Sequence, residues 1–159
     1  MIKAHHYAAT VNWTGARHGT TTSYKAYSRE YTASVAGKPA LSLSADPAFL
    51  GDGSLHNPED LLVLSLSACH LLTYLAECAR VGVHVLAYDD QASGTMTWNG
   101  TTYQFSEVVL RPHVVIAAGG DVDQATELHH RSHELCFIAQ SMNFPVRHEP
   151  HVTVSTGEM

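Results

Sequence analysis

Positive charge is scarce in this sequence. Of its 159 residues only nine are lysine or arginine, against 15 aspartates and glutamates, and the formal net charge is -6. The nine cationic residues are scattered and form no basic stripe that could neutralise a row of phosphates. We therefore expect no nucleic-acid partner.

The sequence also lacks a long apolar run. The N-terminal residues 1–6 show neither the positive region nor the apolar stretch of a signal peptide. The longest apolar stretch, residues 61–76, contains Ser65, Ser67 and His70 and is shorter than the roughly 20 apolar residues of a membrane span. We expect a buried helix here and no membrane association.

Cysteine is represented by three residues, Cys69, Cys78 and Cys136. Without a secretion signal they indicate a reducing compartment, in which paired cysteines tend to be catalytic rather than structural. The expected location is the cytoplasm.

The chain is long and apolar enough for one compact domain, 1–159, since 45% of its residues are hydrophobic. The pattern predicts an antiparallel hairpin of residues 2–12 and 21–36 around a turn at 14–19, and then a short strand at 41–43. Residues 45–56 form a loop long enough to have a function.

Two helices alternate with further strands. Asn57 and Pro58 begin a helix that ends near Arg80, before Gly82. A second helix, begun by Asp121, is predicted to run to about Met142. Strands are predicted at 83–98 and 103–117, joined by a turn at Asn99-Gly100, and at 151–155. The fold class is α+β, with two long helices packed on sheet.

Cysteine positions leave two interpretations open. Cys69 falls in the middle of the first predicted helix and Cys136 in the last third of the second, so their sulfurs can meet if the helices cross there. Cys78 follows Cys69 by nine positions, which turns it about 180° away on the same helix. The three are either a redox pair with one bystander or three small buried hydrophobes.

A family resemblance favours the redox pair. Residues 57–62, Asn-Pro-Glu-Asp-Leu-Leu, the triplet Ser67-Ala68-Cys69 and the order of elements resemble the OsmC/Ohr family of osmotically inducible and organic hydroperoxide resistance proteins. The resemblance implies an OsmC-like fold, with antiparallel sheets and two long central helices, in an intertwined homodimer with active sites at the subunit interface. It also implies thiol-dependent reduction of hydroperoxides, above all organic ones, without a cofactor, and turnover by an external dithiol.

The same resemblance assigns roles to four residues. Cys69 resembles the cysteine that attacks the peroxide, and Cys136 the cysteine that resolves the resulting sulfenic acid. Glu59 resembles the glutamate that holds a substrate-binding arginine, for which Arg29 is our choice and Arg17 the rival. A carboxylate in the first turn of a helix also has a purely structural reading.

This chain departs from the family pattern after both cysteines. Phe137-Ile138-Ala139 follows Cys136, where the family has Pro and, two residues later, Ser. His70 follows Cys69 in place of an aromatic residue. The chain thus resembles a divergent branch, and its substrate does not follow from the resemblance.

Twelve histidines suggest a second class of function. His129 and His133 lie one helical turn apart, with Cys136 three residues further on, a spacing that a metal ion can bridge. A His/Cys metal site, or a ligand-binding domain without catalysis, is therefore the alternative to the peroxidase. Our main expectation includes no metal.

Overall fold

The computed structural model describes residues 3–157. Two compact units divide the chain between Leu61 and Leu62. The expectation that residues 1–159 form a single domain stays a prediction.

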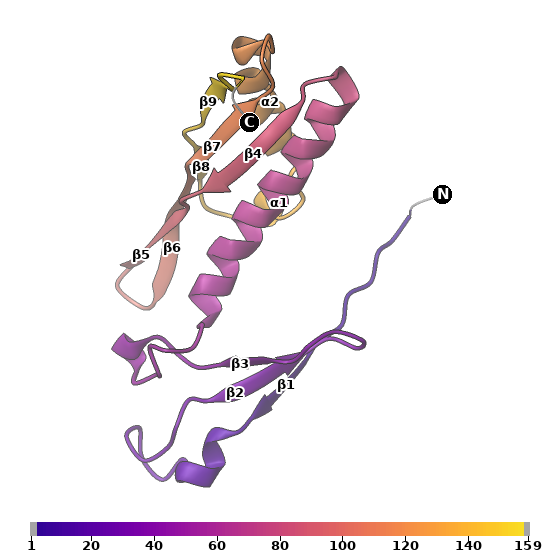
Figure 1. Ribbon diagram of the computed structural model, residues 1–159. Helices are drawn as coiled ribbons and strands as arrows, with labels where there is room; N and C mark the ends of the chain where they lie inside the picture. The colour runs from indigo at the N-terminus through magenta and orange to yellow at the C-terminus, as the bar shows by residue number, and fades with distance from the viewer. Residues whose placement is uncertain (1–2, 158–159) are drawn as a thin grey trace. The chain divides into compact units, whose positions relative to one another are not determined.

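The first unit contains an antiparallel sheet of three short strands. These are β1 (Thr10–Trp13), β2 (Tyr31–Ser34) and β3 (Leu41–Leu43), with β2 in the middle (Figure 1). Thr10 pairs with Ser34 and Tyr31 with Leu43. The predicted hairpin and the strand at 41–43 are confirmed.

The hairpin strands are much shorter than predicted, because the connection between them extends from residue 14 to residue 30. The indole of Trp13 donates to the Ser28 carbonyl at 2.8 Å, and the Arg29 guanidinium donates to the carbonyls of Tyr24 and Tyr27. These local hydrogen bonds occupy carbonyl groups that a longer strand would offer to a neighbour. Residue 2 of the first predicted strand, 2–12, lies outside the described residues.

Helix α1 (Pro58–Val81) has the predicted bounds, and its ends show why. The Asn57 side chain accepts from the Asp60 N–H at 2.8 Å, and the Asp60 carboxylate accepts from the Asn57 N–H at 3.3 Å. This reciprocal pair satisfies donors that a helix start leaves open. At the other end Gly82 adopts φ +78°, and the Val83 N–H reaches the Cys78 carbonyl at 3.0 Å.

The second unit contains two three-stranded sheets, ordered β4-β7-β9 and β5-β6-β8. Neighbours in the β4–β7 and β5–β6 pairs are antiparallel, whereas β8 and β9 run parallel to β6 and β7. The strands are β4 (Val85–Asp90), β5 (Ser93–Trp98), β6 (Tyr103–Leu110), β7 (Pro112–Ile116), β8 (Val146–His148) and β9 (His151–Val154).

Both long strands predicted at 83–98 and 103–117 are broken in two. Asp90 explains the break, because its carboxylate accepts from the Arg111 N–H at 2.6 Å and from the Ser67 hydroxyl at 2.6 Å. A side-chain acceptor thus replaces a backbone partner where the chain passes from one sheet to the other. Strand β8 was not predicted, since only three residues form it.

Helix α2 (Val122–Leu135) begins as predicted and ends earlier. The Asp121 carboxylate accepts from the Gln124 N–H at 2.9 Å. Cys136 has extended backbone angles, φ -71° and ψ 106°, and stands just after the helix rather than inside it. The predicted helical continuation to Met142 is replaced by a turn and the short helix η3 (Ala139–Ser141).

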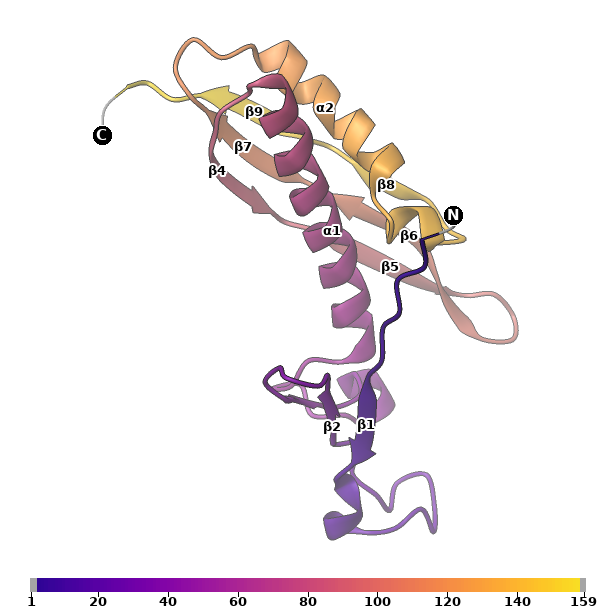
Figure 2. The ribbon, with the colours of Figure 1, turned by 90° about the vertical axis from the view of Figure 1, so that its right-hand side faces the viewer.

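The two long helices cover one face of the sheets of the second unit (Figure 2). Tyr74 and Cys78 of α1 pack with Val114 and Ile116 of β7 and with Ala125 of α2. Nearer the start of α1, a second cluster joins Leu66 to strands β6 and β8, through Val108, Leu110 and Val146. One helix therefore anchors both sheets.

By length and composition alone, α1 could cross a membrane. Its packing in both core clusters instead makes it a core helix. It keeps an apolar face uncovered within the single chain, since Leu64 and Leu72 are 53% and 66% exposed.

Candidate functional site

Within the second unit, helix α1 has a buried face and a partly exposed face. Leu66, His70, Tyr74 and Cys78 recur every fourth position and are buried. Cys69 lies about 100° around the helix from His70 and is only partly buried. The sequence thus places one cysteine in the core and one at its edge.

Cys69 lines a pocket of about 630 Å³. Most of its wall is a stripe of α1, and the remainder comes from the end of α2 and the residues after it. The lining residues are Ser65, Ala68, Cys69, Leu72, Thr73, Ala76, Glu77, Arg80, Leu135 and Phe137. The wall is largely apolar near the sulfur, and its only charged side chains are Glu77 and Arg80.

The thiols of Cys69 and Cys136 form a hydrogen bond. Both cysteines are free, so the structure brings together two reduced sulfurs that are far apart in the sequence. The early end of α2 makes this contact possible, because the extended backbone at Cys136 takes its side chain off the helix surface. Because the two thiols are in contact, they can condense to a disulfide after one of them is oxidised.

The environment of Cys136 keeps its thiol protonated. Burial, followed by the hydrogen bond to Cys69, raises the pKa of Cys136 to about 11. Bonds from the backbone N–H groups of Ala139 and Ile138 act in the opposite direction and do not cancel the effect of burial. At neutral pH Cys136 is therefore a thiol, and Cys69, which faces the pocket, is the more accessible sulfur.

Cys78 belongs to the core and not to the pocket. It is buried beside Tyr74, with which it forms a hydrogen bond, and burial raises its pKa. Its place on the far side of α1 agrees with the 180° rotation expected from the sequence.

Glu77 and Arg80 form an ion pair on the pocket wall that the sequence analysis missed. Glu77 is 11% exposed and Arg80 is 67% exposed. The helical period holds the signal that could have found them, since Cys69, Thr73, Ala76 and Arg80 fall on one stripe of α1.

The proposed arginines have other partners within the first unit. Arg29 lies over the rings of Tyr24 and Tyr27, at 4.8 Å and 4.0 Å from their centroids. Arg17 pairs with Glu30 at 2.7 Å, in a small pocket that also includes Tyr31. The Glu59 carboxylate contributes to a raised pKa of Tyr31, whose main cause is burial. Within residues 3–157, Glu59 makes no ion pair with either arginine.

Histidines from three elements meet beside the core face of α1. The His70 and His129 rings are stacked, and their Nε2 and Nδ1 atoms lie 3.0 Å apart. His148 of β8 stacks on His70 and approaches His130 to 3.2 Å. His133 completes the group, 5.4 Å from His148 between ring centroids. We call these five residues the histidine cluster.

Three members of the histidine cluster, His70, His129 and His148, are neutral at pH 7. Burial, and then the neighbouring histidines, lower the pKa values of His70 and His148 to about 4 and that of His129 to about 3. His70 Nδ1 and His129 Nε2 have no hydrogen-bond partner among the described residues, so a proton there would lack an acceptor.

The spacing of His129 and His133 does not produce a metal site. In the part of the chain that the structure describes, no group of three or more His, Cys, Asp or Glu side chains could hold a metal ion. His129 is buried against Tyr74 and His70, while the ring of His133 faces His148. The sequence alternative of a metal centre is therefore not supported.

The fold and the site together define a class of protein. It is an α+β protein in which a cysteine of a long central helix meets a second cysteine beside a largely apolar pocket. The family model described as "OsmC-like protein" matches residues 51–151. The chain belongs to the OsmC-like family.

Solved and curated relatives agree with this assignment. An OsmC-like protein of unknown function from Vibrio cholerae is 31% identical, with a TM-score of 0.85, and the match covers 93% of this chain and 100% of that one. The uncharacterized protein YmaD of Bacillus subtilis is 22% identical over 96% of this chain and 97% of its own length. An organic hydroperoxide resistance protein OsmC from Legionella pneumophila has the same fold, with 16% identity, a TM-score of 0.71 and coverage of 96% and 100%. The predicted OsmC-like fold is confirmed, and the low identities fit a divergent branch.

The histidine cluster predicts a loss of stability in acid. Well above pH 6.5, His70, His129 and His148 are neutral in both the folded and the unfolded state, and the stability they contribute is fully present. As the pH falls below 6.5, the unfolded chain binds protons that the folded chain takes up only near pH 4 or below. We expect the free energy of unfolding to fall steadily from pH 6.5 to about 4, measured by urea denaturation.

His129→Gln removes one titrating group and keeps a hydrogen-bonding side chain. It should make this pH dependence shallower, whereas His113→Gln, at an exposed position on β7, should leave it unchanged. An unfolding free energy that does not vary between pH 6.5 and 4 would contradict the assignment of neutral, buried histidines.

Proposed function

We propose that this protein is a cytoplasmic thiol-dependent peroxidase that reduces organic hydroperoxides and is returned to its reduced state by an external dithiol. The observation that carries the proposal is the hydrogen bond between the Cys69 and Cys136 thiols at the wall of the pocket. The partly apolar lining of that pocket favours an organic hydroperoxide over hydrogen peroxide.

The reaction needs only the two cysteines and the reductant. The Cys69 thiolate attacks one peroxide oxygen, so that an S–O bond forms, the O–O bond breaks and the leaving alkoxide takes a proton to become an alcohol. The Cys136 thiol then attacks the sulfur of the sulfenic acid, an S–S bond forms and water leaves. A dithiol exchanges with this disulfide, becomes oxidised itself and restores both thiols.

The different environments of the two cysteines support their different roles. Cys69 is partly exposed and faces the pocket, as an attacking thiolate must. Cys136 is 1% exposed and protonated at neutral pH, so it does not compete for the peroxide. This asymmetry of burial supports Cys69 as the attacking cysteine and Cys136 as the resolving one.

Glu59 and Arg29 form the second part of the proposal. An arginine held by Glu59 would favour the Cys69 thiolate and bind the peroxide, with Arg17 as the rival. Because Arg29 is held by the carbonyls of Tyr24 and Tyr27, its participation would require these bonds to open, or a second subunit to supply the cation.

The description of one relative supports this activity. The Legionella pneumophila protein, described as an organic hydroperoxide resistance protein, shares the fold at 16% identity. The more similar Vibrio cholerae protein is described as having unknown function. Direct measurement of peroxide consumption is therefore the deciding experiment.

Replacing Cys69 and Cys136 by serine, one at a time, should give two different results. Cys69→Ser should abolish the consumption of cumene hydroperoxide in the presence of a dithiol. Cys136→Ser should permit about one turnover and then over-oxidise, since the sulfenic acid has lost its partner. Intact-protein mass spectrometry distinguishes the disulfide from sulfinic and sulfonic acids.

Cys78→Ser is the matched control, because Cys78 is a core residue of the same helix. It should retain steady-state turnover and form the Cys69–Cys136 disulfide. Undiminished turnover by Cys69→Ser would disprove the peroxidase mechanism.

Two arginine substitutions test the activation of Cys69. If Arg29 provides the cation, Arg29→Ala should lower the thiolate fraction of Cys69 at neutral pH by about tenfold, and Arg17→Ala should not. The alkylation rate of Cys69 as a function of pH, measured in the Cys78→Ser background, reports that fraction. If both variants show the same alkylation profile as the Cys78→Ser protein with both arginines in place, neither arginine takes part in the mechanism.

The exposed apolar face of α1 predicts a homodimer. Leu64, Leu72 and Leu75 are between 37% and 66% exposed. So much apolar surface on one helix is unfavourable in water and marks an interaction surface. We expect a permanent homodimer that buries well over about 2,000 Å². Sedimentation should show no monomer at micromolar concentration. The variant Leu72→Glu should shift the equilibrium toward monomer. A stable monomer of the unmodified chain would refute this assembly.

A further inference from the structure

His148 of β8 contacts both helices of the second unit close to the two cysteines. Its ring stacks on that of His70, with 5.7 Å between the centroids, and His70 directly follows Cys69 on α1. Its Nε2 atom is 3.2 Å from Nδ1 of His130, and its ring centroid is 5.4 Å from that of His133, both in the second half of α2. One side chain of β8 therefore connects the two helices at the level of the thiols.

The backbone of His133 connects this contact to the second cysteine. Its carbonyl accepts from the Cys136 N–H at 3.4 Å and from the side-chain amide of Gln140 at 3.0 Å. The Gln140 N–H in turn donates to the Cys136 carbonyl at 3.0 Å. The position of Cys136 therefore depends on where the last turn of α2 is held, and the imidazole of that turn faces His148.

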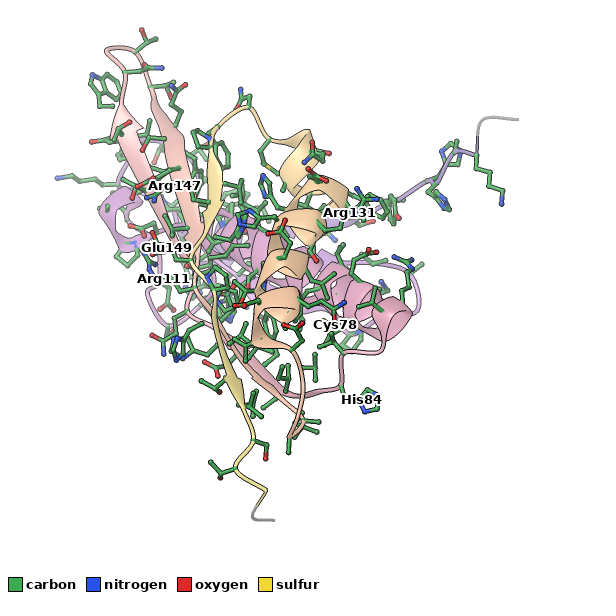
Figure 3. All side chains as sticks on the ribbon, turned by 90° about the horizontal axis from the view of Figure 1, so that it is seen from above. Cys78, His84, Arg111, Arg131, Arg147 and Glu149 are labelled. Atoms are coloured by element: carbon green, nitrogen blue, oxygen red, sulfur yellow. The ribbon has the colours of Figure 1, made fainter. Side chains whose placement is uncertain are left out.

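The alternation of β8 turns His148 toward the helices. Val146 is buried, Arg147 is exposed and His148 is half-buried, so the first and third side chains share the inner face of the strand. Val146 packs in the core cluster of α1 and β6. Arg147, on the opposite face, pairs with the carboxylates of Glu107 and Glu149 (Figure 3).

The surroundings of His148 are other imidazoles and aromatic rings. Besides the histidine cluster, Tyr74 of α1 and Tyr88 of β4 border the site through their contacts with His129. The charged side chains of α2 nearby, Arg131 and Glu134, are exposed and pair with each other at 3.2 Å. Among the described residues no carboxylate pairs with His148, and its Nδ1 atom is buried without a hydrogen-bond partner. A proton on this ring would therefore place an uncompensated charge between the helices.

From these contacts we propose that His148 is a positioning residue for Cys136, whose neutral imidazole holds the end of α2 where the two sulfurs meet and whose protonation releases it. The inference rests on the proposed function and adds a pH-dependent control of its resolving step. His148 acts through His133 and takes no part in the thiol chemistry itself.

Acid favours the released state because the held imidazole resists protonation. Burial, and then His130 and His133, lower the pKa of His148 to about 4, whereas a solvated imidazole titrates near 6.5. Well above pH 6.5 the ring is neutral in both states, and its hold on α2 is fully present. Between pH 6.5 and 4 the released state binds the proton preferentially, so its population should rise on the order of tenfold from pH 7 to 5.

Substitutions at His148 test the positioning role at neutral pH. Reduced protein is oxidised with excess cumene hydroperoxide, and mass spectrometry gives the ratio of Cys69–Cys136 disulfide to sulfinic acid. His148→Ala should lower this ratio about fivefold at pH 7, and His148→Gln, with a side chain of similar length, should restore most of it. His84→Gln, exposed in the connection after α1, is the control and should keep the full ratio (Figure 3). The rate of the first oxidation step should be the same in all of these proteins.

The pH profile provides a readout that a merely structural role would not change. From pH 7 to 5, with folding followed by circular dichroism, the ratio should fall about tenfold further in the unmodified and His84→Gln proteins than in His148→Gln, which has no proton to bind at this position. Because the same thiols react in each protein, the comparison at equal pH cancels their own pH dependence.

Hydrogen exchange tests the role of His148 without any peroxide. At pH 5, after correction for the intrinsic exchange rate, peptide 133–142 should exchange faster in the unmodified protein than in His148→Gln. Equal exchange in the two proteins, or the same pH profile of the disulfide ratio in both, would overturn the role of His148. Failure of the unmodified protein to consume hydroperoxide would instead refute the proposed function, and the exchange measurement would still decide whether His148 holds the end of α2.

Discussion

The second unit depends on how α1 packs. Its buried positions Leu66, Tyr74 and Cys78 connect two separate sheets, and within residues 3–157 no other helix takes part in both core clusters through a fully buried side chain. The hydrogen bonds between Asn57 and Asp60 fix where this helix begins, and with it which residues face inward. A shift of one residue would turn Cys69 by about 100°, away from the pocket and from Cys136.

Much of the fold could be predicted from the sequence because interactions between neighbouring residues determine it. Asn57, Gly82 and Asp121 mark helix ends through backbone bonds that any sequence with these residues would favour, and all three were predicted correctly. The errors fall where a distant group competes with local preference. Asp90 interrupts two apolar strands because its carboxylate replaces a backbone acceptor for Arg111, and no periodicity reveals such a bond in advance.

Part of the candidate site could also be predicted, because it depends on the local geometry of one helix. The helical period placed Cys69 and Cys78 on opposite sides of α1, and the family resemblance pointed to Cys136. The contact between the two sulfurs depends on the end of α2, where the chain becomes extended one residue after Leu135. Glu77 and Arg80 went unnoticed because a charged pair three residues apart on a helix is common and becomes informative only once a pocket is seen beside it.

The position of Cys136 has a mechanical consequence. The Cα atom of a residue within a helix cannot move far without breaking the i to i−4 bonds of its own turn. Cys136 lies beyond α2, and its backbone is held by the bond from its N–H to the His133 carbonyl and the bond from the Gln140 N–H to its own carbonyl. The sulfur can thus move relative to Cys69 through rotations of a short hinge while α2 and its packing on β9 stay in place, so that disulfide formation in the proposed cycle would deform a few residues rather than the core.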